Sequence, residues 1–189
     1  MRRVLRAYKK TVSIVNETAT GLYAGLAQGR KGFLLESYDK NNGRYSFFGT
    51  EPEEIVTSKG QSLVIIKKDG ETGVREGNPA ELLKQYYSEF TVYKDDGELA
   101  FTGGLVGSLG YDFVRYTEKL PDENPDEIGI ETIQMMLTTK YIVIDHVAET
   151  LTGVCLEEDT PEGRERGTEE AEKLIERARK NMDDSKTVF

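Results

Sequence analysis

Residues 33–49 read FLLESYDKNNGRYSFFG, and this stretch is the most informative part of the sequence because it predicts a β-hairpin with a polar site at its end. A short apolar run ends on Glu36 and Ser37, a polar loop follows, and an aromatic run closes the stretch. Two β-prone runs on either side of turn residues predict a β-hairpin. A carboxylate beside an apolar wall can pair with the ammonium group of an amino acid, so the end of the first strand is a candidate ligand site. From the residues alone, an ordinary strand end with Ser37 bonded to nearby backbone is the simpler interpretation.

Further strands are indicated on both sides of the centre of the chain. Runs at 55–58 and 63–67, followed by the turn signal Asp69-Gly70, predict an antiparallel meander. Three more strands are expected at 130–137, 140–147 and 151–157, with turn residues around Thr138 and Thr139. The middle strand of the three is apolar on both faces, which is typical of a central strand covered on both sides.

Helices are expected at three places. Asn78 is a capping residue and Pro79 suits the first helical position, so a helix is predicted from there to about Phe90. A short helix is expected around 22–27. Apolar residues at helical spacing predict a C-terminal amphipathic helix at about 165–183. We therefore expect an α+β fold of mostly antiparallel sheet with flanking helices, organised as one domain over 1–189 with its core at about 1–158.

Composition excludes several classes of function. The net charge of -9 argues against a nucleic-acid partner, because such proteins use basic groups to neutralise phosphates. No apolar stretch approaches the length of a membrane span, so no membrane partner is expected. The single cysteine, Cys155, excludes an internal disulfide and a cysteine-based metal cluster. A chain of this kind fits a reducing compartment, and we expect it in the cytoplasm.

The sequence offers no convincing catalytic group. The glycine-rich run at 103–112 lacks the residues of a phosphate-binding loop, and close backbone packing is the better interpretation. His146 is the single histidine of the chain, and we interpret it as a structural residue at a strand end. Asp112 and Arg115 are expected to form a local ion pair. Acidic clusters such as 51–54 are interpreted as solvated loop residues, so no metal ligand is predicted.

Four separated segments, in order, resemble the amino-terminal domain of component I of anthranilate synthase, the large, chorismate-using subunit. They are residues 33–37, 43–49, 103–112 together with Arg115 and Tyr116, and 144–146. In that family the complete subunit is a lyase that converts chorismate and ammonia to anthranilate and pyruvate in tryptophan biosynthesis. A glutamine amidotransferase subunit, component II, supplies the ammonia. The resemblance implies that this chain stops before the larger chorismate-binding domain, which holds the Mg2+ site.

The resemblance also implies what the hairpin is for. Glu36 and Ser37 correspond to contacts for L-tryptophan, the family's feedback inhibitor, and Arg44, Tyr45 and Ser46 follow on the returning strand. No catalytic residue, metal ligand or cofactor is implied within this chain, and alone it is expected to be inactive as an enzyme. Its sheets are expected to form part of a layered β-sandwich that the chorismate-binding domain completes.

Two alternatives stay open at this point. The equivalent domain of aminodeoxychorismate synthase component I, in the folate pathway, shares this layout, although the Leu-Leu-Glu-Ser spelling at 34–37 favours the anthranilate enzyme. The second alternative is that the chain is a stand-alone, non-enzymatic adaptor domain. A broad apolar sheet face left uncovered would favour either docking of another protein or a missing domain.

Overall fold

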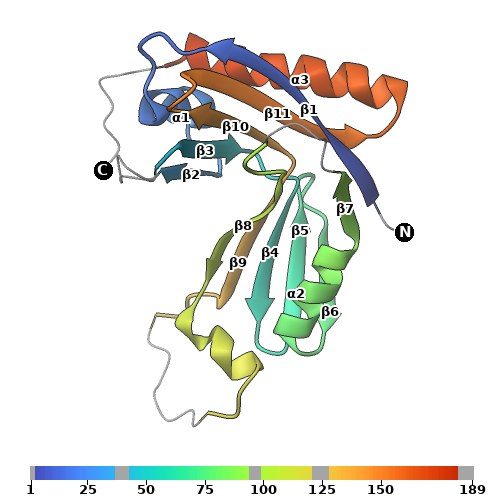
Figure 1. Ribbon diagram of the computed structural model, residues 1–189. Coiled ribbons are helices and arrows are strands. Elements are labelled where there is room, and N and C mark those ends of the chain that lie inside the picture. Colours follow the sequence, from blue (N-terminus) through green and yellow to red (C-terminus); the bar gives the residue numbers. More distant parts are fainter. Residues whose placement is uncertain (1–2, 37–42, 94–98, 121–127, 183–189) are drawn as a thin grey trace.

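The computed structural model describes residues 3–36, 43–93, 99–120 and 128–182, and its fold is α+β with two mostly antiparallel sheets and flanking helices. This confirms the expected fold class. The first sheet has the strand order β2-β3-β10-β11-β1-β7, and the second has the order β6-β5-β4-β9-β8. Among the described strand pairs, only β1 with β7 is parallel. Figure 1 shows the two sheets meeting near the middle of the molecule.

The first sheet consists of β1 (Arg3–Ser13), β2 (Gly32–Glu36), β3 (Tyr45–Thr50), β7 (Phe90–Tyr93), β10 (Lys140–Asp145) and β11 (Thr150–Glu158). The second sheet consists of β4 (Glu54–Lys59), β5 (Ser62–Lys67), β6 (Thr72–Glu76), β8 (Gly104–Leu109) and β9 (Ile133–Thr138). The helices are α1 (Ala19–Ala27), α2 (Pro79–Ser88), the 3-10 helix η1 (Tyr111–Tyr116) and α3 (Pro161–Lys180).

Helices α1 and α3 cover one face of the first sheet (Figure 1). Phe48 of β3 and Ile142 of β10 are completely buried beneath them, in a cluster that includes Leu174 of α3. Close approach of α3 requires a glycine in the strand below, because a Cβ at Gly153 would lie 2.1 Å from the carbonyl oxygen of Ala171. The first sheet and these two helices therefore form a tightly packed layer pair.

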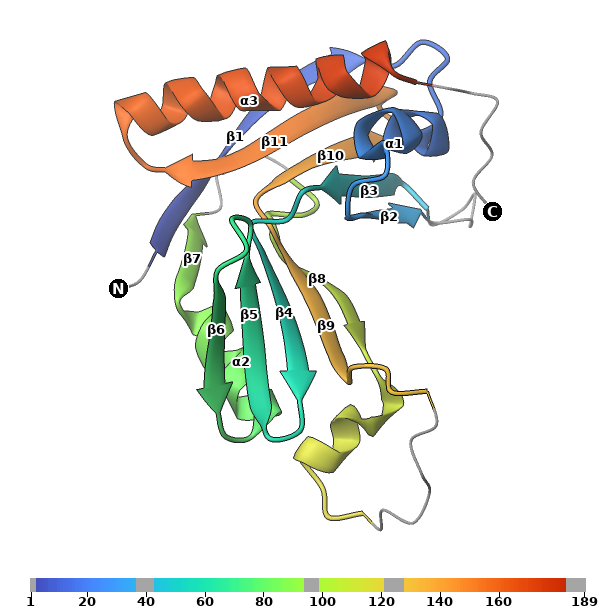
Figure 2. The same cartoon turned by 180° about the vertical axis from the view of Figure 1, so that it is seen from behind.

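The second sheet is covered on one face alone by the described helices. Val56, Leu63 and Ile133 on that face pack against α2 in a separate cluster. The opposite face carries alternate side chains of the same strands, including Ile55 and Val64. Figure 2 shows this opposite face with α2 behind the sheet. Residues of β4, β8 and β9 line a broad hollow of about 450 Å³ there. We call this surface the open face.

The chain passes directly from one sheet to the other between β9 and β10. We expected a turn at Thr138 and Thr139, but β9 and β10 belong to different sheets and a single residue, Thr139, links them. The backbone N–H of Leu156 in β11 donates to the carbonyl of Thr139 at 2.8 Å. This hydrogen bond fixes the link between β9 and β10 to β11, a central strand of the first sheet. The prediction of a turn at Thr138 and Thr139 was therefore wrong.

The predicted local elements are present with shifted boundaries. The meander of β4, β5 and β6 is confirmed, and Oδ1 of Asn78 caps α2 by accepting from the N–H of Ala80 at 2.9 Å. Helix α2 ends at Ser88 instead of near Phe90, because Phe90 pairs with Arg3 of β1 and begins β7. The C-terminal helix begins at Pro161, before the expected position near 165. Within the described residues, no helix combines the length and the apolar character that crossing a bilayer requires.

Candidate functional site

The hairpin of β2 and β3 is present and is paired antiparallel, with Glu36 opposite Ser46. Ser46 in turn lies opposite Ile144 of β10, and Tyr45 lies opposite Asp145. Directly opposed residues share a face of the sheet, so Glu36 and Ser46 point to the side that carries α1, while Tyr45 and Asp145 point to the other. Ser37, which was also predicted to contact the ligand, lies outside the described residues.

Ser46 is held by the histidine that follows β10. Its side chain is completely buried, and its Oγ lies 2.7 Å from Nε2 of His146, within hydrogen-bonding distance. The backbone N–H of His146 also donates to the carbonyl of Arg44 at 2.9 Å. These two contacts give His146 the structural role expected for a histidine at a strand end. They also place its exposed ring beside the hairpin.

Arg44 and Asp145 form a two-pronged ion pair at the start of β3. Nη2 of Arg44 donates to the Asp145 carboxylate at 2.7 Å and Nε donates at 3.1 Å, while the guanidinium stacks over the Tyr45 ring, 4.9 Å from its centroid. Asp145 also accepts from the N–H groups of Val147 and Ala148, each at 3.0 Å. The Arg44 hydrogen bond is the largest cause that lowers the pKa of Asp145, to about 2. Asp145 is therefore a firmly ionised anchor.

Glu36 differs from Asp145 because its carboxylate is exposed and has no hydrogen bond or ion pair with any of the described residues. Asp145 is fully engaged with Arg44 and two backbone groups, so among the described residues here Glu36 is the carboxylate that is available to a cationic group. A ligand ammonium at this position would gain a charge-assisted hydrogen bond. An exposed carboxylate with no partner among the described residues therefore lies at the end of β2.

The pair of Ser46 and His146 does not have the arrangement of a nucleophile and its base. Ser46 has no exposed surface, so no substrate carbonyl can reach its Oγ. The Asp145 carboxylate turns to Arg44 and to backbone N–H groups of its own loop, so it does not orient the imidazole as a triad carboxylate would. The arrangement therefore supports a structural role.

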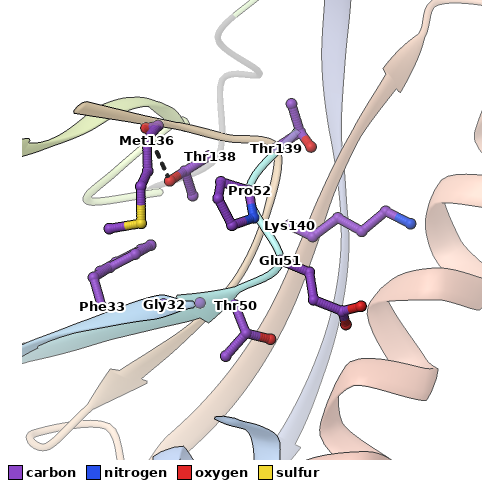
Figure 3. A pocket seen from close by; sticks show the side chains of 10 residues that line it. Gly32, Phe33, Thr50, Glu51, Pro52, Met136, Thr138, Thr139 and Lys140 are labelled. Carbon is purple, nitrogen blue, oxygen red and sulfur yellow. Dashed lines mark hydrogen bonds between the residues drawn. The ribbon is translucent and has the colours of Figure 1, made fainter. Parts of the chain in front are cut away.

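A small pocket lies at the opposite end of the same hairpin, where Gly32 pairs with Thr50 (Figure 3). Phe33, Thr138 and Lys140 also line it, and the hydroxyl of Thr138 lies 3.5 Å from the carbonyl oxygen of Met136. Its volume is about 10 Å³, which is room for one water molecule. This pocket is therefore too small for an amino acid.

The acidic residues do not form a metal centre within the described part of the chain, where no group of three or more potential ligands converges. Glu54 was expected to be a solvated loop residue, and this was wrong. It lies in β4, is almost completely buried, and accepts from the Tyr86 hydroxyl at 2.7 Å and from Arg3 at 3.0 Å. The expected ion pair of Asp112 and Arg115 is present at 2.7 Å.

Sequence reasoning did not identify Asp145 and His146 as parts of the site. Both lie near the end of the strand that was expected to be central, at 140–147, and that position was the available signal. Their roles depend on β10 being the neighbour of β3, which brings them to Arg44 and Ser46 from 101 and 100 residues away. The local sequence pattern of β3 does not specify that β10 is the strand beside it.

The fold therefore defines an α+β domain of two antiparallel sheets with a polar site at a hairpin end. None of the protein-family models compared with the chain matches it. Curated relatives do match, and the two described below are named anthranilate synthase component 1. The protein of Acetivibrio thermocellus is 31% identical over 137 residues, or 71% of this chain. That of Pseudomonas aeruginosa is 33% identical over 170 residues, or 86% of this chain.

The chain spans 28% and 34% of the lengths of these two relatives. A solved structure of anthranilate synthase component I from Streptococcus pneumoniae is 23% identical, with a TM-score of 0.49, and the match covers 89% of this chain and 37% of that one. The chain belongs to the anthranilate synthase component I family, as a partial, amino-terminal domain. The assignment rests on the curated relatives and confirms the resemblance seen in the sequence.

Proposed function

We propose that this chain is the L-tryptophan-binding regulatory domain of an anthranilate synthase component I. The observation that carries the proposal is the exposed Glu36 carboxylate, which has no partner among the described residues and lies in register with the buried Ser46. Glu36 would pair with the ligand ammonium, and the hydrogen bond of Ser46 with His146 would fix the strand beside it. Ser37, Arg44 and Tyr45 are also part of the proposed site, with Tyr45 on the opposite face of the sheet from Glu36.

The activity of the complete subunit is proposed from family membership. It would convert chorismate and ammonia to anthranilate and pyruvate, with ammonia from a glutamine amidotransferase subunit. The described residues hold no convergent set of acidic oxygens that would suit Mg2+, so we place no step of that chemistry in this chain. In this proposal the chain senses tryptophan, and the chorismate-binding domain performs the reaction.

The open face of the second sheet supports a partner of this kind. It exposes apolar side chains such as Val74, and a hollow of about 450 Å³ lies over β4, β8 and β9. Soluble proteins seldom leave a broad apolar face without a function. We propose that the chorismate-binding domain packs here and completes a β-sandwich. Tryptophan can then regulate the enzyme only by binding one arrangement of the two domains more tightly than the other.

A stand-alone adaptor is the second candidate, because the open face would serve a separate partner protein equally well. The relatives support the biosynthetic enzyme, since those described above share the name anthranilate synthase component 1. The same names favour the anthranilate enzyme over aminodeoxychorismate synthase. Binding of tryptophan is the property that separates the regulatory domain from the adaptor.

Calorimetric titration of L-tryptophan into the chain, joined to the chorismate-binding domain of a family member, tests the proposal. We expect saturable binding that Glu36→Ala weakens by about tenfold or more, because a charge-assisted hydrogen bond is lost. The matched control is Glu71→Ala, which removes an exposed carboxylate next to the turn between β5 and β6 and is expected to leave binding unchanged. Absence of binding, or equal affinity in the Glu36 variant, would contradict the proposal.

A further inference from the structure

A cavity of about 130 Å³ lies where the two sheets meet, away from the hairpin site. Its walls come from both sheets and from the end of α2, in the region where β7 approaches β1 in Figure 1. The larger side chains around it are those of Leu5, Tyr87, Phe90, Val92, Leu137 and Leu156. The lining is therefore mostly aliphatic and aromatic.

Two successive glycines line this space. Gly103 and Gly104 line the cavity and have φ angles of +78° and +116°, which L side chains rarely adopt. A Cβ at Gly103 would come within 2.4 Å of Cδ1 of Leu156, so no larger residue fits there. The hydrogen bond from Leu156 to Thr139 joins two of the walls at 2.8 Å. Gly103 therefore allows the close approach of Leu156, and Gly104 places no side chain between itself and Tyr87.

The absence of charged side chains among the described lining residues favours an uncharged ligand. None of the described residues that line the cavity carries a charge, and the polar side-chain groups among them are the hydroxyls of Thr102, Thr139 and Tyr87. A zwitterionic amino acid would leave its ammonium and carboxylate buried without partners, which is strongly unfavourable. Engineered apolar cavities of about 150 Å³ stay dry and bind benzene or xenon. The volume here is close to that size, but this space is partly open to solvent, since Tyr87 in its lining is 57% exposed.

We propose that this cavity binds a small, uncharged aromatic ring of about the size of benzene. A ring in this position would contact β1, β7, β9 and β11 together, and so would join the first sheet to the second. The proposal does not depend on tryptophan binding at the hairpin, because the two sites share no residue.

Titration of benzene into the 189-residue chain, followed by methyl NMR, tests this inference. We expect saturable shifts and intermolecular NOEs at the methyl groups of Leu137 and Leu156. Val92→Phe fills the cavity and should weaken binding by about tenfold or more. Val74→Phe makes the same change on the open face and should have no effect, and L-tryptophan should not compete.

Two results would overturn the inference. One is the absence of saturable shifts in the folded chain, and the other is a set of NOEs to methyl groups outside the cavity. If Val92→Phe fails to fold, the NOEs in the unaltered chain still decide the matter. Loss of tryptophan binding with benzene binding retained would refute the proposed regulatory role alone.

Discussion

The two sheets of the molecule are built from similar strands, but they are covered differently. The first sheet buries Phe48, Ile142 and Leu151 completely beneath α1 and α3. The second sheet buries one face against α2, while Val74 on its opposite face stays 57% exposed. The difference is that helices among the described residues cover one face of the second sheet and leave its other face open, which is the face we propose for a partner.

The largest expected effect is a difference in the free energy of unfolding between a variant at a buried position and a variant at a position on the open face. Phe48→Ala leaves a cavity beneath α1 and should lower the free energy of unfolding by about 3–5 kcal/mol. Val74→Ala should change it by less than about 0.5 kcal/mol. Chemical denaturation of both variants measures the contrast. Similar losses would show that the open face is already buried in solution.

A smaller contrast uses one glycine from each sheet. Gly153→Ala forces a methyl group against the carbonyl of Ala171 in α3 and should destabilise the chain by about 1–3 kcal/mol. Gly73→Ala on β6 meets no atom within 4 Å and should be neutral or stabilising by up to about 1 kcal/mol. Thermal unfolding followed by circular dichroism compares the two. A neutral Gly153 variant would show that α3 packs less closely than described.

The smallest expected effect concerns ion pairs and pH. The folded-state pKa of Asp145 is lowered to about 2 from an ordinary value of 3.8. Its ion pair with Arg44 therefore contributes stability that is fully present above about pH 4 and is lost as the pH falls towards 2. Asp145→Asn should cost about 1–2 kcal/mol at pH 7 and almost nothing near pH 2.

Denaturant titrations at several pH values measure this dependence. The control is Glu71→Gln, which removes an exposed pair with Lys67 next to the β5–β6 turn and should have little effect at any pH. A pH-independent cost at Asp145 would mean that its backbone hydrogen bonds, and not its charge, hold the site.

Local signals were sufficient for much of the secondary structure. Asn78 and Pro79 marked the start of α2, and Asp69-Gly70 marked the turn between β5 and β6, because caps and tight turns depend on a few adjacent residues. The same reasoning failed at Phe90. Its backbone pairs with Arg3, 87 positions earlier in the chain, and local propensity does not report such a pairing.

The sequence by itself determined the α+β class, the hairpin at 33–49 and membership of the anthranilate synthase component I family, since each depends on short patterns in a fixed order. The tertiary structure alone decided that β10 lies beside β3, which joins Arg44 to Asp145 and Ser46 to His146. It also decided that Thr139 links two different sheets and that a cavity remains between them. Strand neighbours are chosen by the packing of the whole chain, so they become visible only when the whole chain is folded.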